Sequence, residues 1–182
     1  METYFGYIET VQDALLIFES CRIGALPRVH RRLNERERRW LRSGSVYVWD
    51  EEESDVRRWT DGRLWSPSRI RGRFLVYREL SCRRTEAMDV DSPEDPLSDA
   101  VMSGTGGSHA YGGRGHSYSN SNGSIVPNGL IKRTIAVETS SGRRLHLISY
   151  FSEADLASGA LPRPRFDPRL QHVQIPREIY PE

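Results

Sequence analysis

The sequence predicts an α+β fold in which two separate blocks of the chain build one antiparallel sheet. Apolar residues with strand or helix periodicity lie in residues 1–82 and 128–161, whereas residues 83–127 are rich in Gly, Ser and Asn and contain few aliphatic side chains. The second block offers only two strands and a short helix, too little apolar surface to fold alone. We therefore expect a single intertwined domain interrupted by a disordered linker, with residues 162–182 as a Pro-rich extended tail.

In the first block the clearest local signal is a helix start. Thr10 is followed three residues later by Asp13, an arrangement close to a capping box, and Gly24 is placed to end the helix. The elements expected here are a strand over Tyr4–Ile8, a helix over Val11–Ser20, one or two short helices within Arg28–Arg42, a strand over Ser45–Trp49, a solvated acidic loop over Asp50–Asp55, a turn-rich segment over Val56–Ser68 and a strand over Phe74–Leu80.

The second block reads as a β-hairpin followed by a helical turn. Its two apolar segments are separated by a short turn sequence, which is typical of paired antiparallel strands. The elements expected here are a strand over Gly129–Glu138, a turn at Ser140–Gly142, a strand over Leu145–Phe151 and a short helix over Glu153–Ser158 that Ser152 caps.

Composition excludes several classes of protein. No stretch approaches the roughly 20 apolar residues that cross a bilayer, so no membrane association is expected. The N-terminus has neither the basic nor the apolar region of a secretory signal. Cys21 and Cys82 stand in no metal-binding spacing, so we expect reduced thiols, no metal and no cofactor.

The sequence also lacks a recognisable catalytic motif. The Gly-rich run GTGGSHAYGGRG follows no strand and opens no helix, so it lacks the context of a dinucleotide-binding loop. No arrangement of Ser, His and Asp in the ordered blocks suggests a nucleophilic triad. We therefore expect no enzymatic activity and no small-molecule substrate.

Charge is segregated along the chain, although the net charge is only +1. Residues 1–85 hold 17 arginines against 13 acidic residues (+4), residues 86–127 hold one against six (−5), and residues 128–182 hold eight basic groups against six acids (+2). Lys132 is the only lysine among the 26 basic residues. Such a bias suits phosphate contacts and narrow A·T-rich minor grooves, although a high genomic G+C content would produce it as well.

The most informative segment is RRWTDGRLWSPSRIRGR, residues 57–73. It contains six arginines and two tryptophans but one acid, and its turns allow a loop to protrude into a DNA groove. We interpret Trp59 and Trp65 as core anchors, and we predict DNA contacts for Arg57, Arg58, Arg69 and Arg71.

Read together, the ordered blocks resemble the WOPR box, the DNA-binding region of fungal regulators of morphological switching, sporulation and pathogenic growth. The resemblance covers about residues 3–80 and 128–161. It is carried by GYIETVQDAL, CRIGALPRVHRRLNERER, RSGSVYVWDEEES, RRWTDGRLWSPSR, GRFLVYREL, GLIKRTIAV and HLISYFSEADLASGAL.

The resemblance implies a nuclear transcription regulator that binds double-stranded DNA at an A·T-rich element, through arginine and lysine side chains and protruding loops. It implies no metal or cofactor. The residues that it places at or beside DNA are Arg57, Arg58, Trp59, Thr60, Asp61, Gly62, Ser68, Arg69, Arg42, Ser43, Lys132, Arg133 and Thr134.

Thr60 carries a further prediction. Arg57-Arg58-Trp59-Thr60 is a site for a basophilic protein kinase, and Thr60 matches the position that the resemblance gives to the kinase site of the family. A phosphate of about −1.5 to −2 charge at this position would repel DNA.

One alternative of another class stays open. Trp, Tyr and Arg are also enriched at protein interfaces, so the chain could be a protein-interaction module that uses the Trp/Arg loop and the Pro-rich tail.

Overall fold

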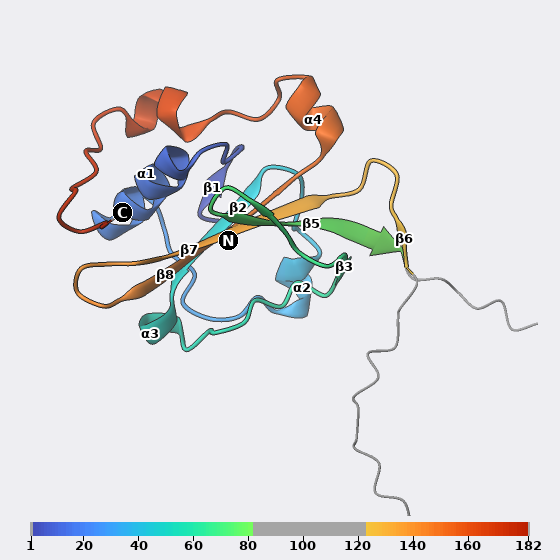
Figure 1. Ribbon diagram of the computed structural model, residues 1–182, viewed down its shortest axis with the longest axis horizontal. Coiled ribbons are helices and arrows are strands. Elements are labelled where there is room, and N and C mark those ends of the chain that lie inside the picture. Colours follow the sequence, from blue (N-terminus) through green and yellow to red (C-terminus); the bar gives the residue numbers. More distant parts are fainter. Residues whose placement is uncertain (1, 82–122, 182) are drawn as a thin grey trace, which may run out of the picture. The chain divides into compact units, whose positions relative to one another are not determined.

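An eight-stranded antiparallel sheet, drawn from both sequence blocks, organises the fold (Figure 1). The computed structural model describes residues 2–81 and 123–181. The β7–β8 hairpin of the second block lies between β2 and β5 of the first, so the sheet is intertwined as predicted. The strands are β1 (Tyr4–Phe5), β2 (Ser45–Asp50), β3 (Leu64–Trp65), β4 (Arg69–Arg71), β5 (Phe74–Ser81), β6 (Ser124–Ile125), β7 (Ile131–Glu138) and β8 (Arg144–Phe151).

The helices of the described residues are short, and α1 is the longest of them. Both arms of its capping box are formed between Thr10 and Asp13. Gly24, with φ of +79°, follows the helix end and supplies the left-handed conformation that lets the chain leave the helix. The helices are α1 (Val11–Arg22), α2 (Glu35–Arg38), α3 (Glu51–Ser54), α4 (Glu153–Ala157) and two 3₁₀ turns, η1 (Pro164–Phe166) and η2 (Pro168–Leu170).

One face of the sheet packs on α1 and on the C-terminal segment, which lie on the same side of it in Figure 1. Buried side chains of this core include Phe18 of α1, Leu147 of β8, and Leu170 and Tyr180 of the C-terminal segment. The tail was predicted to be extended, and this prediction is wrong. Two of its prolines, Pro164 and Pro168, begin 3₁₀ turns, and Leu170 and Tyr180 complete the core beside α1.

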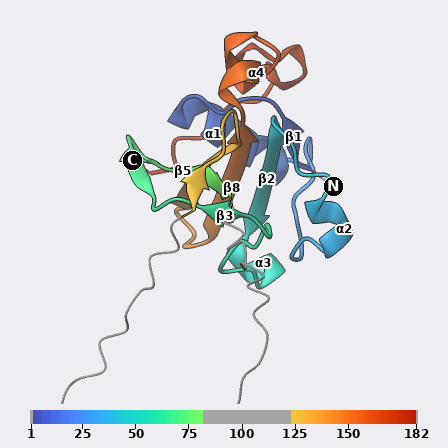
Figure 2. The same ribbon diagram turned by 90° about the vertical axis from the view of Figure 1, so that its right-hand side faces the viewer.

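The other face is covered only in part, by the irregular segment before β2 and by the segment between α3 and β3. These segments pack against Tyr47, Trp49 and Tyr150 of the sheet. The second segment adds Trp59 to this cluster, and β3 adds Trp65. Figure 2 shows β2 beside β8, with α4 and α3 toward opposite ends of these strands. The uncovered part of this face forms the floor of the site described below.

Two further predictions need correction. The acidic run contains a helical turn rather than only a loop, because the Asp50 side chain accepts hydrogen bonds from the amides of Glu52 and Glu53. The predicted linker ends too late, since Ser124–Ile125 forms a strand paired with β5. The rest of the predicted linker, residues 83–122, lies outside the described residues.

Candidate nucleic-acid interface

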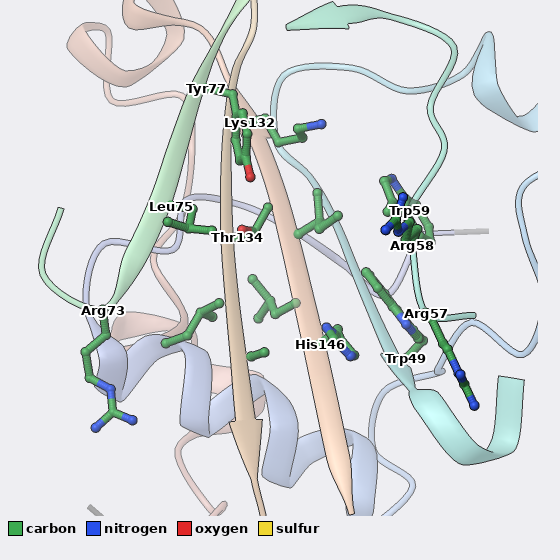
Figure 3. Close-up of a pocket in the computed structure, with 14 residues that line it drawn as sticks. Trp49, Arg57, Arg58, Trp59, Arg73, Leu75, Tyr77, Lys132, Thr134 and His146 are labelled. Carbon is green, nitrogen blue, oxygen red and sulfur yellow. The ribbon is translucent and has the colours of Figure 1, made fainter. Parts of the chain in front are cut away.

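The segment after α3 presents two arginines from a rigid aromatic support. Trp59 stacks on Trp49 of β2 with ring centroids 4.8 Å apart and an interplanar angle of 17°. Its Nε1 also donates a hydrogen bond to the Tyr150 hydroxyl at 2.9 Å. Aromatic pairs of this kind contribute about 0.5–1.5 kcal/mol beyond their buried area. Trp59 is thus an anchor, and the adjacent Arg57 and Arg58 are exposed (Figure 3).

Asp61 lies in the interior and retains 6% of its accessible surface. Its carboxylate accepts hydrogen bonds from Trp65 Nε1 at 3.0 Å and from the Tyr150 hydroxyl at 2.7 Å, and it pairs with Lys132 Nζ at 3.4 Å. Burial alone would raise the pKa of Asp61, but these donors and the lysine charge outweigh it and hold the pKa below its usual value. The carboxylate therefore ties its loop to β7 and β8.

The chain bends directly after Asp61. Gly62 has φ of +75°, which L side chains rarely adopt, and the Arg63 amide donates to Asp61 Oδ1 at 3.0 Å. Arg63 then turns toward the protein and pairs with Glu79 at 2.7 Å. Thr60, on the other side of the turn, is exposed, and no hydrogen bond joins its side chain to another described residue.

Lys132 reaches the same cluster from β7. Its ammonium lies 4.4 Å from the ring centroid of Trp65 and 4.9 Å from that of Tyr77, and its side chain is only 12% exposed. Burial lowers the pKa of Lys132, and the opposing charge of Asp61 limits the decrease. The ammonium therefore already has a carboxylate and two aromatic rings as partners.

Arg133 and Thr134 point to opposite faces of β7. The Arg133 guanidinium lies 4.0 Å from the Phe74 ring centroid and donates to the Ile8 carbonyl at 2.8 Å and to the Tyr7 hydroxyl at 3.1 Å. It thus joins β7 to the chain before α1. Thr134 instead lies on the uncovered face of the sheet.

The uncovered face and the segment 57–59 enclose a groove of about 500 Å³ (Figure 3). Leu75, Tyr77 and Thr134 form one side of it, and Trp59 with its two neighbouring arginines forms the other. Arg73 stands at one end, at the start of β5. We call this hollow the sheet groove.

Sequence reasoning missed several residues that line the sheet groove. His146 stacks on Trp49 with ring centroids 4.9 Å apart, and its Nε2 lies 2.9 Å from Glu51 Oε2. This hydrogen bond lowers the pKa of Glu51. Tyr77 was missed as well. Leu75 and Tyr77, two alternate residues of β5, face the sheet groove, but only the pairing register shows which alternate set does so.

The structure separates Arg69 and Arg71 from the sheet groove. They pair with Val76 and with Phe74 across the β4–β5 hairpin. Directly opposite residues share a face, and Phe74 is buried in the α1 core, so both arginines point to the α1 side of the hairpin. There they line a second hollow of about 390 Å³ together with Ser66, Ser68, Arg78 and neighbouring residues.

Arg42 and Ser43 occupy a third place, between α2 and β2. Arg42 pairs with Glu2 at 3.0 Å and lies 4.5 Å from the Phe5 ring centroid. The Ser43 hydroxyl accepts a hydrogen bond from the Ser152 amide at 2.9 Å. Neither residue lines the sheet groove. The predicted site residues are therefore distributed over several surfaces of the domain.

The described residues hold no cluster of three or more side chains suited to a metal ion. None of their helices is long and apolar enough to cross a membrane.

The sequence is similar to those of several fungal regulators. The sequence profile of the Gti1/Pac2 family matches residues 3–152. The cAMP-independent regulatory protein pac2 of Schizosaccharomyces pombe is 39% identical over 201 aligned residues, which cover 100% of this chain and 83% of pac2. The global transcription regulator FGP1 of Gibberella zeae is 37% identical, and the alignment covers 97% of this chain and 62% of FGP1. The chain thus spans about three-fifths of the length of FGP1.

A solved structure has the same fold. The WOPR domain of Wor1 from Candida albicans, in complex with a 13 bp double-stranded DNA, superposes with a TM-score of 0.69 at 35% sequence identity. The match covers 98% of this chain and 93% of that domain. Together with the family profile, it confirms the WOPR resemblance inferred from the sequence motifs.

Proposed function

Because this chain belongs to the Gti1/Pac2 family, whose named members include transcription regulators rather than enzymes, we propose that it is a sequence-specific DNA-binding transcription regulator that reads an A·T-rich element in the nucleus. One observation carries the proposal: Arg57 and Arg58 stand exposed on a fixed aromatic support at the rim of the sheet groove. The relatives named above and the DNA complex of the Wor1 domain support it.

The arginines of residues 57–73 differ in how far internal partners neutralise them. Arg57 has only a long contact of 3.8 Å to Glu51 and is 80% exposed, whereas Arg63 is committed to Glu79 at 2.7 Å. The guanidiniums that pair with no acidic group among the described residues are those of Arg58, Arg69, Arg71 and Arg73. Such unpaired guanidiniums can neutralise phosphates and release counterions, and a narrow A·T-rich minor groove favours their insertion.

We assign the less exposed residues of the loop to positioning. Trp59 and Asp61 fix the backbone that carries Arg57 and Arg58, and Gly62 adopts the positive φ that the bend after Asp61 requires. A guanidinium that is held by its backbone loses less conformational freedom on binding than one on a mobile loop. Lys132 belongs to this support because it pairs with Asp61.

The remaining predicted residues fall into two groups. The first group lies outside the sheet groove, in two separate places: one holds Ser68, Arg69 and Arg71, and the other holds Arg42 and Ser43. We propose that these residues contact phosphates that flank the site rather than base edges. The last group comes from β7: Thr134 contributes to the groove floor, and Arg133 positions the strand.

Thr60 supplies a regulatory position in the same proposal. It is exposed, lies next to Trp59 and follows Arg57 and Arg58 closely in the chain. Phosphorylation by a basophilic kinase would place an anion beside these two guanidiniums, where it would compete with DNA phosphates.

The alternative was a protein-interaction module that uses the Trp/Arg loop and the Pro-rich tail, and the structure weakens the part that depends on the tail. Pro164 is buried and Tyr180 packs into the α1 core, so this part of the tail is committed to the fold.

The proposal is tested by selecting binding sites from random duplexes and then measuring affinity against salt concentration. We expect an A·T-rich consensus, and a steep loss of affinity with added salt. Arg58→Ala should weaken binding of the selected duplex by about 1–3 kcal/mol if its side chain reaches a base edge. Arg177→Ala removes an exposed arginine of the C-terminal segment and serves as the matched control. Recovery of no consensus, or equal affinities for both variants, would contradict the proposal.

A further inference from the structure

Strand β7 continues past the start of β5, and part of its outer edge has no strand beside it. The pairing of β5 with β7 ends where Leu75 lies opposite Thr134, whereas β7 runs on to Glu138 in its hairpin with β8. Figure 1 shows the β7–β8 hairpin extending beyond the other strands at this end of the sheet. We call residues 136–138 the free β7 edge.

The backbone of the free β7 edge offers hydrogen-bonding groups to the outside. The Thr139 amide donates a hydrogen bond to the Arg143 carbonyl at 2.9 Å. Because alternate residues of an antiparallel strand direct their N–H and C=O groups to the same side, the odd-numbered residues of β7 bond to β8. The even-numbered residues direct these groups to the other edge of β7, where β5 lies. The Glu79 amide, which donates to the Leu130 carbonyl at 3.0 Å, shows the same alternation at the other end. Ala136 and Glu138 therefore direct their N–H and C=O groups outward, where no described residue pairs with them.

A groove of about 690 Å³ runs along this edge. Val11 and Leu15 of α1, Val137 of β7 and Tyr180 of the C-terminal segment supply its apolar lining. Buried or half-buried side chains of this kind form a preorganised pocket for one apolar side chain. The groove therefore combines an unpaired strand edge with a pocket beside it.

Two charged residues of the same groove are free of ion pairs with described residues. Arg73 follows the β4–β5 turn near Ala136, and Glu138 ends the strand. By strand alternation, both side chains lie on the face of the sheet opposite to the face that carries Val137. A strand added along this edge would therefore meet one positive and one negative group on one face, and the apolar pocket on the other.

We propose that the free β7 edge binds an extended peptide of a partner protein by β-strand addition. Three consecutive peptide residues define the recognised pattern. The middle residue is apolar and enters the pocket formed by Val11, Leu15 and Tyr180. Its neighbours point to the opposite face, where an acidic residue meets Arg73 and a basic residue meets Glu138. Main-chain hydrogen bonds supply the affinity, and the alternate side chains supply the specificity.

Other occupants fit this edge less well. DNA would bring phosphates toward the Glu138 carboxylate and leave the apolar pocket empty. A second copy of this chain, paired edge to edge, would bring its own α1 and Tyr180 onto the same face, into the space that the peptide side chain needs. A small ligand lacks the repeating N–H and C=O groups that a strand edge requires.

The inference is tested with the full chain and a phage-displayed library of random peptides, selected at physiological ionic strength so that the expected ion pairs with Arg73 and Glu138 are not fully screened. Enriched peptides are then synthesised. We expect the basic–apolar–acidic pattern, read in either chain direction, and slower exchange of the Ala136 and Glu138 amides when a peptide is bound. Amide exchange distinguishes strand addition from docking through side chains alone.

Two variants and one control complete the test. Ala136→Pro removes the outward N–H, and should weaken peptide binding by about tenfold, the loss expected for a main-chain hydrogen bond. Arg73→Glu changes an exposed turn residue, and should exchange the selected acidic residue for a basic one even if Ala136→Pro does not fold. Arg58→Ala should bind the peptide as the parent does, whether or not the chain binds DNA. The inference is overturned if no peptide is enriched, if both edge variants bind as the parent does, or if the chain dimerises through this edge.

Discussion

Replacing Asp61 by alanine should destabilise the domain by about 3–5 kcal/mol, the cost of removing one partner of a buried ion pair. The size of this loss follows from the groups that the substitution leaves without a partner. Lys132 keeps a charge on a side chain that is only 12% exposed, and the Tyr150 hydroxyl and Trp65 Nε1 lose their acceptor. A lost hydrogen bond to a charged acceptor costs about 1.5–3 kcal/mol by itself, and the losses overlap within one network.

The pH dependence of stability provides an independent readout. The pKa of Asp61 is lower in the folded chain than in the unfolded chain. The ionised carboxylate therefore stabilises the folded chain at a pH above the unfolded-state pKa of about 3.9. This stabilisation is lost as the pH falls through the folded-state pKa. The Asp61→Asn variant should therefore lose stability relative to the parent near neutral pH. The difference should shrink as the solution is acidified below the ordinary carboxyl range.

Urea titrations followed by tryptophan fluorescence measure both effects. Glu153→Gln is the control, since it breaks an exposed pair with Arg78 and should change the unfolding free energy by less than about 1 kcal/mol. The double variant Asp61→Ala/Lys132→Met should recover part of the loss, because it removes the uncompensated charge. A cost below about 1 kcal/mol for Asp61→Ala, or no recovery in the folded double variant, would refute the role we give to this carboxylate.

Three further predictions concern the neighbouring groups. Thr60→Glu should reduce affinity for the selected duplex without lowering the melting temperature, and a mimic that binds as tightly as the parent would refute the switch. Trp59→Leu removes a stacked ring and a hydrogen bond to Tyr150, so both the duplex affinity and the melting temperature should fall; an unchanged affinity would show that the support is dispensable. Tyr180→Phe removes a donor that lies 3.0 Å from the buried Glu19 carboxylate and should cost about 1–2 kcal/mol in urea titrations, whereas no change would contradict the stabilising role of this hydrogen bond.

Sequence periodicity predicted the four longest strands, β2, β5, β7 and β8, because the signals that define them are local; it missed the short strands β3, β4 and β6. The alternation in β7 and β8 and the short turn between them specify a hairpin, and the capping box of Thr10 and Asp13 specifies the start of α1. The C-terminal segment was mispredicted because proline content indicates an irregular backbone but not its burial. Leu170 and Tyr180 are too widely spaced for any periodic pattern, and only the packed structure shows that α1 needs them.

The candidate site was harder to predict than the fold. The sequence shows that residues 57–73 are rich in arginine, but it does not show which guanidiniums are neutralised by a partner distant in the chain. Arg63 meets Glu79, and Arg133 meets the carbonyl of Ile8, through contacts that depend on sheet register. Resemblance to a family assigns the whole motif to the DNA interface. It does not show that the Asp61 carboxylate within this motif is buried while the guanidiniums near it are exposed.

The arrangement of the support also explains why the loop requires both sequence blocks. Trp59 and Asp61 belong to the first block, while Tyr150 and Lys132, to which they bond, belong to the second. Without the β7–β8 hairpin the loop would lose its hydrogen-bond partner, its ion pair and the strand beside β2 at once. The presentation of Arg57 and Arg58 is therefore a property of the assembled sheet, and the arginines acquire a fixed position only when residues separated by about half the chain have come together.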